Sequence, residues 1–382
     1  MPLLFSDYVH SLQRHRSTKQ KRLNHLQHRT PQEMLLRLRR STVVGYSTIE
    51  RTKLPHIDTI FDLPVFAPYF QELSSISPVA MRFVRLFAAS LAVITFDNAF
   101  SSPYVGDLDL KVMSFNLRTS IANDPCPSGC WEERKWRVKQ LLERYEPDLI
   151  GTQEGAPDQI EFFQSQLSFA STGECAGDCQ WNERNSIFYR LDRWELLETA
   201  TFALSNTPAV LPSNTWGLEY LRAAVIARFR DKKINRVVCM LNTHFDIRLG
   251  HSQSAVLVAK QLSQRCQPED TVLMTGDLNT GTQSSAVQYI IGQDPIDEGF
   301  TPIPMYETLT AASADGPTWI GSSFGNHVVG SKLDYIFSRR DNHTCLRNAT
   351  ILTDTFDGYS SSDHAVLLSK FCLGTECVSC IA

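Results

Sequence analysis

From residue 109 onward, the chain alternates short apolar runs with longer stretches of mixed polarity. The apolar runs are rich in Val, Ile, Leu and Phe, which is typical of buried strands. Two longer stretches, 131–145 and 253–265, are predicted as helices. Interleaved strands and helices over residues 103–382 indicate one α/β domain without an internal repeat. The predicted strands are 110–115, 149–153, 185–189, 223–228, 237–242, 271–275, 333–337 and 365–371.

The first 80 residues lack this pattern, since basic and Gln-rich sequence is followed by prolines scattered among apolar residues. We predict 1–80 as a disordered or non-domain basic extension, with a targeting role as the alternative. Residues 81–102 have a basic start, an apolar run and small residues after it, which is a signal-peptide pattern. Translation starting at Met81 would explain its position. A signal-anchor is the alternative, although the run is shorter than a bilayer span of about 20 residues.

Charge is divided unevenly along the chain. Residues 1–102 carry 13 Lys and Arg against 7 Asp and Glu, whereas the remainder carries 24 against 34, a net charge of −10. An acidic domain repels polyanions unless a basic groove or a bound metal intervenes. The charge therefore argues against a nonspecific nuclease.

The chain has 10 cysteines, several of them in close pairs. Their even number and clustering suit disulfides, whereas zinc is the alternative because CxxxC pairs can be ligands. No histidine stands at zinc-finger spacing beside them, and the signal-like segment indicates an oxidising compartment. Two sequons, at Asn342 and Asn348, are compatible with a secreted or extracellular glycoprotein. The predicted disulfides are Cys126–Cys130 and Cys175–Cys179, with Cys372, Cys377 and Cys380 paired among themselves or to the body of the domain.

Polar residues follow most of the predicted strands. A single Asp after a strand says little, because caps and turns use Asp freely. The combination says more, since oxygen ligands from Glu, Asp and Asn suit Mg²⁺, or Mn²⁺ in its place. Two histidines among carboxylates suit acid–base and phosphate chemistry. The residues concerned are Asn116, Glu154, His244, Asp246, Asp277, Asn279, Asp334, Asp363 and His364.

These segments, in this order, resemble the endonuclease/exonuclease/phosphatase superfamily over roughly residues 110–372. The likeness is greatest to its poorly characterised metal-dependent hydrolases, through 115–118, 131–138 and 187–190. The resemblance implies a four-layer α/β sandwich, with two mixed β-sheets packed face to face and flanking helices. The motifs that carry it are Ser114-Phe115-Asn116, Gln153-Glu154, Asn242-Thr243-His244-Phe245-Asp246, Gly276-Asp277-Leu278-Asn279, Leu333-Asp334-Tyr335-Ile336-Phe337 and Ser362-Asp363-His364.

The resemblance also implies a metal site. Glu154 supplies its carboxylate, Asn116 joins it or contacts the phosphate, and Asp363 completes the metal or histidine environment. The segments with Cys126/Cys130 and Cys175/Cys179 are insertions relative to the pattern and border the expected cleft, so they bear on substrate choice. The weaker, substrate-binding candidates are Arg118, Glu183, Asn185 and Arg222.

The catalytic roles follow from the same resemblance. Asp277 orients and activates the attacking water, and Asn279 fixes its geometry. His244 donates to a nonbridging oxygen. His364 contacts the phosphate and is held and kept protonated by Asp334. The complete set favours catalysis over a non-catalytic binding protein on the same fold.

We therefore predict a monomeric, Mg²⁺-dependent hydrolase of a phosphomonoester or phosphodiester. Its substrate is expected to be a small molecule, a lipid head group or a nucleotide, with nucleic acid less favoured. The alternatives are a secreted nuclease, which needs a basic groove, and a sphingomyelinase-like phosphodiesterase, for which 216–221 is a candidate lipid-docking loop.

Overall fold

The structure is a computed structural model, which describes residues 109–297, 299–325, 330–374 and 380–381. The extension predicted at 1–80 and the signal-like segment at 81–102 lie outside the described residues and stay predictions. Within the described ranges, no helix has the length and apolar character needed to cross a bilayer.

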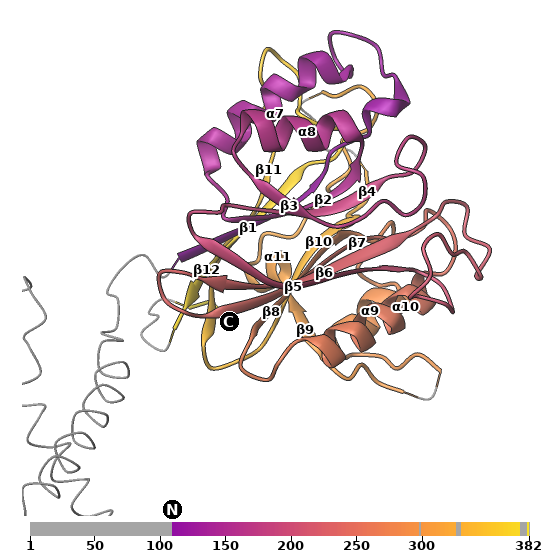
Figure 1. The fold of residues 1–382 in the computed structure, drawn as a ribbon, viewed down its shortest axis with the longest axis vertical. Helices are drawn as coiled ribbons and strands as arrows, with labels where there is room; N and C mark the ends of the chain where they lie inside the picture. Colours follow the sequence, from indigo (N-terminus) through magenta and orange to yellow (C-terminus); the bar gives the residue numbers. More distant parts are fainter. Residues whose placement is uncertain (1–108, 298, 326–329, 375–379, 382) are drawn as a thin grey trace, which may run out of the picture. The chain divides into compact units, whose positions relative to one another are not determined.

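Two six-stranded sheets form the centre of the domain (Figure 1). The first sheet consists of β1 (Asp109–Asn116), β2 (Leu149–Gly155), β3 (Ala170–Thr172), β4 (Arg184–Tyr189), β11 (Thr344–Leu352) and β12 (Val366–Leu373). The second consists of β5 (Trp194–Ala203), β6 (Ala223–Asp231), β7 (Val237–His244), β8 (Thr271–Asp277), β9 (Met305–Glu307) and β10 (Asp334–Arg339). Their spatial orders are β11-β12-β1-β2-β4-β3 and β5-β6-β7-β8-β10-β9.

Both sheets are mixed, as predicted. The pairs β1/β2 and β7/β8 are parallel, whereas the other neighbouring strands are antiparallel. A parallel pair needs a crossover connection. The helices α7 (Trp131–Tyr145) and α9 (His251–Arg265) lie in these two connections, and both were predicted from the sequence within two residues of their bounds.

Helices cover the outer face of each sheet (Figure 1). α7 and α8 (Pro157–Gln166) bury apolar side chains against the first sheet, and α9 and α10 (Ser285–Ile290) do so against the second. A third apolar cluster, which includes Leu110, Trp194 and Phe371, fills the space between the sheets. The short helices η2 (Ser120–Ala122) and α11 (Thr308–Ala311) lie in connections. This helix–sheet–sheet–helix arrangement confirms the four-layer α/β sandwich.

Three long elements were missed in the sequence. β5 and β11 are edge strands, and each contains a bulge that interrupts its alternation, between Leu196 and Glu198 and between Leu346 and Asn348. α8 begins with Pro157, which reads as a chain break but is favourable in the first turn of a helix.

The two predicted local disulfides are confirmed. Their Cα atoms lie 4.9 Å apart in Cys126–Cys130 and 5.3 Å apart in Cys175–Cys179. Cys380 of the tail bonds to Cys345 in β11, which is one of the pairings expected for it. The bond Cys239–Cys266, from β7 to the end of α9, was not predicted. With these cysteines in disulfides, the zinc alternative loses its ligands.

Candidate active site

The predicted catalytic and metal residues come together at one end of the two sheets. The carboxyl ends of a parallel pair meet at one edge, which places the last residues of β1, β2, β7 and β8 there. β10 and β12 run antiparallel to their neighbours, so their first residues lie at the same edge. The residues gathered there are Asn116, Glu154, His244, Asp277, Asn279, Asp334, Asp363 and His364.

Asp277 lies at the centre of this group. Asn116 Nδ2 donates to its Oδ2 at 3.0 Å, from the opposite sheet, and the backbone N–H of Asn279 donates to its Oδ1 at 2.9 Å. The Nε2 atoms of His244 and His364 lie 3.6 Å and 3.8 Å from the same Oδ2. Two imidazoles therefore face one buried carboxylate.

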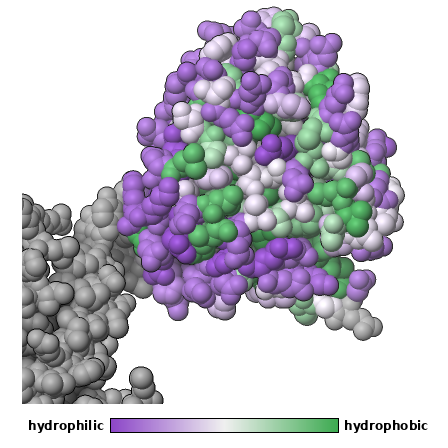
Figure 2. All heavy atoms as spheres, in the orientation of Figure 1, coloured by the Kyte–Doolittle hydropathy of each residue, from purple (hydrophilic) through white to green (hydrophobic). Residues whose placement is uncertain are grey.

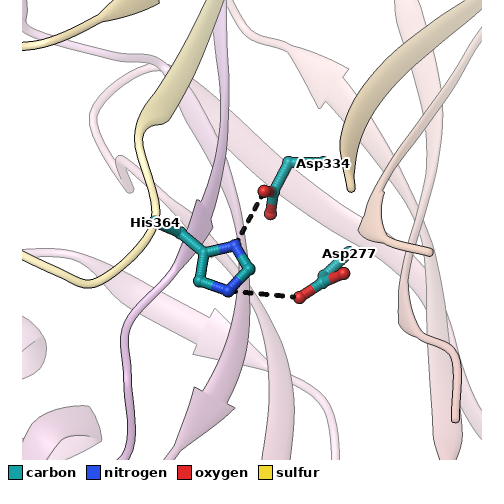
Figure 3. Close-up of side chains that lie close together, drawn as sticks. All are labelled: Asp277, Asp334 and His364. Atoms are coloured by element: carbon teal, nitrogen blue, oxygen red, sulfur yellow. Dashed lines mark hydrogen bonds and ion pairs between the residues drawn. The ribbon is translucent and has the colours of Figure 1, made fainter. Parts of the chain in front are cut away.

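His364 is held between two aspartates (Figure 3). Its Nδ1 donates to Asp334 Oδ2 at 2.8 Å, and Thr318 Oγ1 donates to the same oxygen at 2.7 Å. Burial lowers the pKa of His364, but Asp334 and Asp277 outweigh burial and raise that pKa well above its ordinary value. The geometry therefore favours a protonated His364 whose Nε2 points toward Asp277.

His244 has a carboxylate partner of its own. Its Nδ1 lies 2.6 Å from Glu183 Oε2, and Arg222 Nη1 lies 2.7 Å from Glu183 Oε1. Burial and Arg222 lower the pKa of His244, whereas Glu183 and Asp277 raise it, with a net increase. With Nδ1 bonded to Glu183, Nε2 faces the centre, 2.9 Å from Asn279 Nδ2.

Glu154 and Asp363 form the other side of the site. Glu154 Oε1 accepts from Asn116 Nδ2 at 3.0 Å, and its Oε2 accepts from the backbone N–H of Thr119 at 3.2 Å. Burial raises the pKa of Asp363, His364 lowers it, and the charge of Glu154 raises it again, so the pKa stays above its ordinary value. Carboxylates that repel each other in this way, with an amide beside them, suit a hard cation such as Mg²⁺.

A second grouping could also hold a metal ion. Ligand atoms of Asp277, Asp334 and His364 lie within 4.8 Å of one another. His364 Nδ1 and Asp334 Oδ2 are already bonded to each other, so a metal here would be held through His364 Nε2 and Asp334 Oδ1. The all-oxygen set of Asn116, Glu154 and Asp363 is the one predicted from the sequence.

Comparison with known proteins shows which family the chain belongs to. A model of the Endonuclease/Exonuclease/phosphatase family matches residues 113–364, well over half of the chain. The chain belongs to this family. The resemblance found in the sequence is thereby confirmed.

Solved structures of this family share the fold. An endonuclease/exonuclease/phosphatase from Bacteroides vulgatus is 25% identical with a TM-score of 0.61, covering 69% of this chain and 99% of that chain. The mannosyl-6-phosphatase of Bacteroides thetaiotaomicron is 22% identical with a TM-score of 0.58, over 69% and 99% of the two chains. Among curated proteins, Nocturnin from Drosophila melanogaster is 24% identical over 222 residues, or 51% of this chain. The match covers 32% of Nocturnin, so the chain spans about a third of that relative's length.

Arg118 and Arg222, which were predicted to bind substrate, are each paired with a carboxylate. Arg118 makes two bonds to Asp124, of 2.8 Å and 3.1 Å, and its Nε lies 3.7 Å from Asp363. Arg222 is buried and paired with Glu183. Both carboxylates are close in sequence to the disulfide hairpins, since Asp124 precedes Cys126–Cys130 and Glu183 follows Cys175–Cys179.

Two other predicted residues, Asn185 and Asp246, make hydrogen bonds that hold neighbouring segments of the fold in place. Asn185 Nδ2 donates to the carbonyl of Ala223 at 2.8 Å, which joins β4 to β6. Asp246 accepts from the backbone N–H groups of Tyr220, Arg248 and Leu249 and so caps a loop.

Arg134 supports the site and was not predicted from the sequence. It is fully buried and donates four hydrogen bonds to backbone carbonyls, on Gly129, Leu117, Arg118 and Ser361. Burial lowers its pKa to about 10. It thereby joins the segment after Asn116 to the segment before Asp363. Its place in the matched motif 131–138 was the available signal.

Three site residues have left-handed backbone conformations. The φ angles of Arg118, Glu154 and Asn279 are 50°, 60° and 49°. Such conformations cost about 1–3 kcal/mol for residues other than glycine and persist where surrounding contacts hold them. Glu154 is held in part by the hydrogen bond from the Thr119 N–H. Asn279 is held in part by the hydrogen bond from its own N–H to Asp277.

Proposed function

We propose that the protein is a Mg²⁺-dependent phosphoesterase that hydrolyses a phosphate ester of a small molecule. The observation that carries the proposal is the pair of buried histidine–carboxylate contacts, His244–Glu183 and His364–Asp334, that converge on Asp277. Mn²⁺ would serve in place of Mg²⁺. Membership of the family supports hydrolysis of phosphate esters in general.

Each group of site residues has its own role in the proposed reaction. Asp277 accepts a proton from the attacking water, because Asn116 and the Asn279 backbone hold its carboxylate in place. Protonated His364 donates to a nonbridging oxygen through Nε2, and His244 donates to another. Mg²⁺, held by Glu154, Asp363 and Asn116, would neutralise charge that builds on the phosphoryl group.

The electrostatics favour a substrate with little charge beyond the reacting phosphate. Arg118 and Arg222 are each neutralised by a carboxylate, and residues 103–382 carry a net charge of −10. A polyanion gains little from such a surface. A sugar phosphate or a similar small phosphomonoester fits best, and the name of the mannosyl-6-phosphatase neighbour agrees with this class.

A nuclease is the second candidate. A neighbour, the TDP2 of D. rerio, was solved with a single-stranded DNA product, so the fold admits nucleic acid. For the sphingomyelinase-like alternative, the loop at 216–221 exposes Tyr220, whereas Leu218 is buried and Trp216 Nε1 donates to Asn206 Oδ1. On the face in Figure 2, hydrophobic residues lie in separate groups among hydrophilic ones.

We further propose that the protein acts as a monomer outside the cell. The four disulfides among the described residues are consistent with an extracellular protein.

The deciding experiment measures phosphate or product release from sugar phosphates, nucleotides, inositol phosphates, sphingomyelin and single-stranded DNA, with Mg²⁺ and with EDTA. We expect metal-dependent turnover to be highest on a small phosphomonoester. Preferred cleavage of DNA would favour the nuclease, and no turnover of any substrate would contradict the proposal.

A further inference from the structure

Two sequons lie within and beside the edge strand β11. They read Asn342-His343-Thr344 and Asn348-Ala349-Thr350, and the sequence contains no others. Both asparagines are exposed, although Thr344 and Ala349 are buried. Within the described part of the chain, no hydrogen bond engages either side-chain amide. The amides therefore project from an ordered strand and its turn into solvent.

We propose that Asn342 and Asn348 are sites of N-linked glycosylation. The side-chain amide nitrogen of each would displace the pyrophosphate of a lipid-linked oligosaccharide, forming a bond to the sugar and losing a proton. The sequon hydroxyl is the feature that the transferring enzyme requires. The inference rests on the extracellular location proposed above, but not on the phosphoesterase activity.

Both positions are far from the active site. Asn348 and Lys111 each pair with Lys370, which places Asn348 level with Lys111 in the first sheet. Asn116 lies five residues further along β1, or roughly 16 Å at about 3.3 Å per residue. A glycan on Asn348 therefore leaves the active site open.

Asn342 follows the far end of β10, whose first residue is Asp334. The strand places roughly 17 Å between its two ends. A glycan on this turn therefore also extends away from the catalytic residues.

The strand β11 has an edge that a glycan would protect. An edge strand presents unpaired backbone groups to other chains, and proteins cover or interrupt such edges. Part of this edge is already covered, because Cys380 bonds to Cys345 and the Ile381 N–H donates to the carbonyl of Leu346 at 2.7 Å. A bulge lies between Leu346 and Asn348. Oligosaccharides at the two asparagines would shield the remainder.

The test uses the full chain, carrying a C-terminal tag and purified from its native cells. Peptide N-glycosidase in heavy-oxygen water should increase mobility on a gel and leave labelled aspartate at 342 and 348. Asn342→Gln and Asn348→Gln should each remove one mobility step, and the double variant should remove both. Thr350→Ala should lose the glycan of Asn348, whereas its matched control Thr350→Ser keeps the sequon and should keep the glycan.

The outcomes separate the inference from the proposed function. A thiol count on the same material reports the compartment, and kcat/KM of the double variant should equal that of the wild type. Unmodified asparagines in protein with intact disulfides would overturn the inference, and so would free thiols throughout, because the location would then be wrong. A glycan on one asparagine alone would overturn the assignment of the other.

Discussion

Replacing Glu183 with Gln would leave a buried arginine without its counter-ion. Glu183 lies 2.7 Å from Arg222 Nη1 and 2.6 Å from His244 Nδ1. Breaking a buried ion pair by removing one partner costs about 3–5 kcal/mol. The pKa gives a similar figure: burial raises the pKa of Glu183, but Arg222 and His244 outweigh burial and lower it from 4.5 to about 2. Because one pKa unit is worth about 1.4 kcal/mol, we expect E183Q to lower the free energy of unfolding by about 3 kcal/mol at neutral pH.

The lowered pKa of Glu183 also determines how the stability difference between wild type and E183Q depends on pH. A carboxyl group whose pKa is lowered in the folded state adds stability that is complete above its unfolded pKa, here 4.5, and is lost as the pH falls toward about 2. The stability difference between wild type and E183Q should therefore fall to about half near pH 3. Urea unfolding followed by circular dichroism at both pH values measures it.

A matched control is Glu198→Gln, because Glu198 pairs with Arg228 at 3.0 Å but is 65% exposed. That change should lower the free energy of unfolding by less than about 1 kcal/mol. An E183Q protein as stable as the wild type, or a stability difference that grows on acidification, would contradict this prediction.

Four further predictions concern the site, its support and its metal. Asn242 makes four buried hydrogen bonds, three of them to the opposite sheet, so Asn242→Ala should lower the free energy of unfolding by about 3 kcal/mol in urea titrations; no loss would contradict this. Asp334→Asn should reduce kcat by at least ~10² in protein that still folds, because His364 loses the charge that keeps it protonated. Glu154→Gln should raise the Mg²⁺ concentration for half-maximal activity by at least ~10-fold. EDTA should abolish wild-type activity, and Mg²⁺ or Mn²⁺ should restore it.

Residues carried by local motifs could be located from the sequence. Asn116 and Asp277 each end an apolar run, and a strand that ends in a sheet presents its last residue at the edge. The disulfides Cys126–Cys130 and Cys175–Cys179 could be predicted for a similar reason, since four residues of separation keep the two sulfurs near each other.

Contacts between distant segments could not be predicted in this way. Glu183 meets His244 across 61 positions because β4 faces the second sheet, and this depends on the strand order. Cys239 meets Cys266 only because α9 returns to the start of β7. Arg134 lies in a matched motif, but the backbone carbonyls that it bonds to belong to distant segments that the motif does not identify.

The most direct test of the central claim is the turnover of Asp277→Asn on the best substrate at saturating Mg²⁺. Asn keeps the shape of Asp277 and can still contact Asn116, but it cannot accept the proton of the attacking water. We expect a kcat lower by at least ~10² in a variant that stays folded, with an unchanged Mg²⁺ requirement. Near wild-type turnover in the folded variant would contradict the role of Asp277.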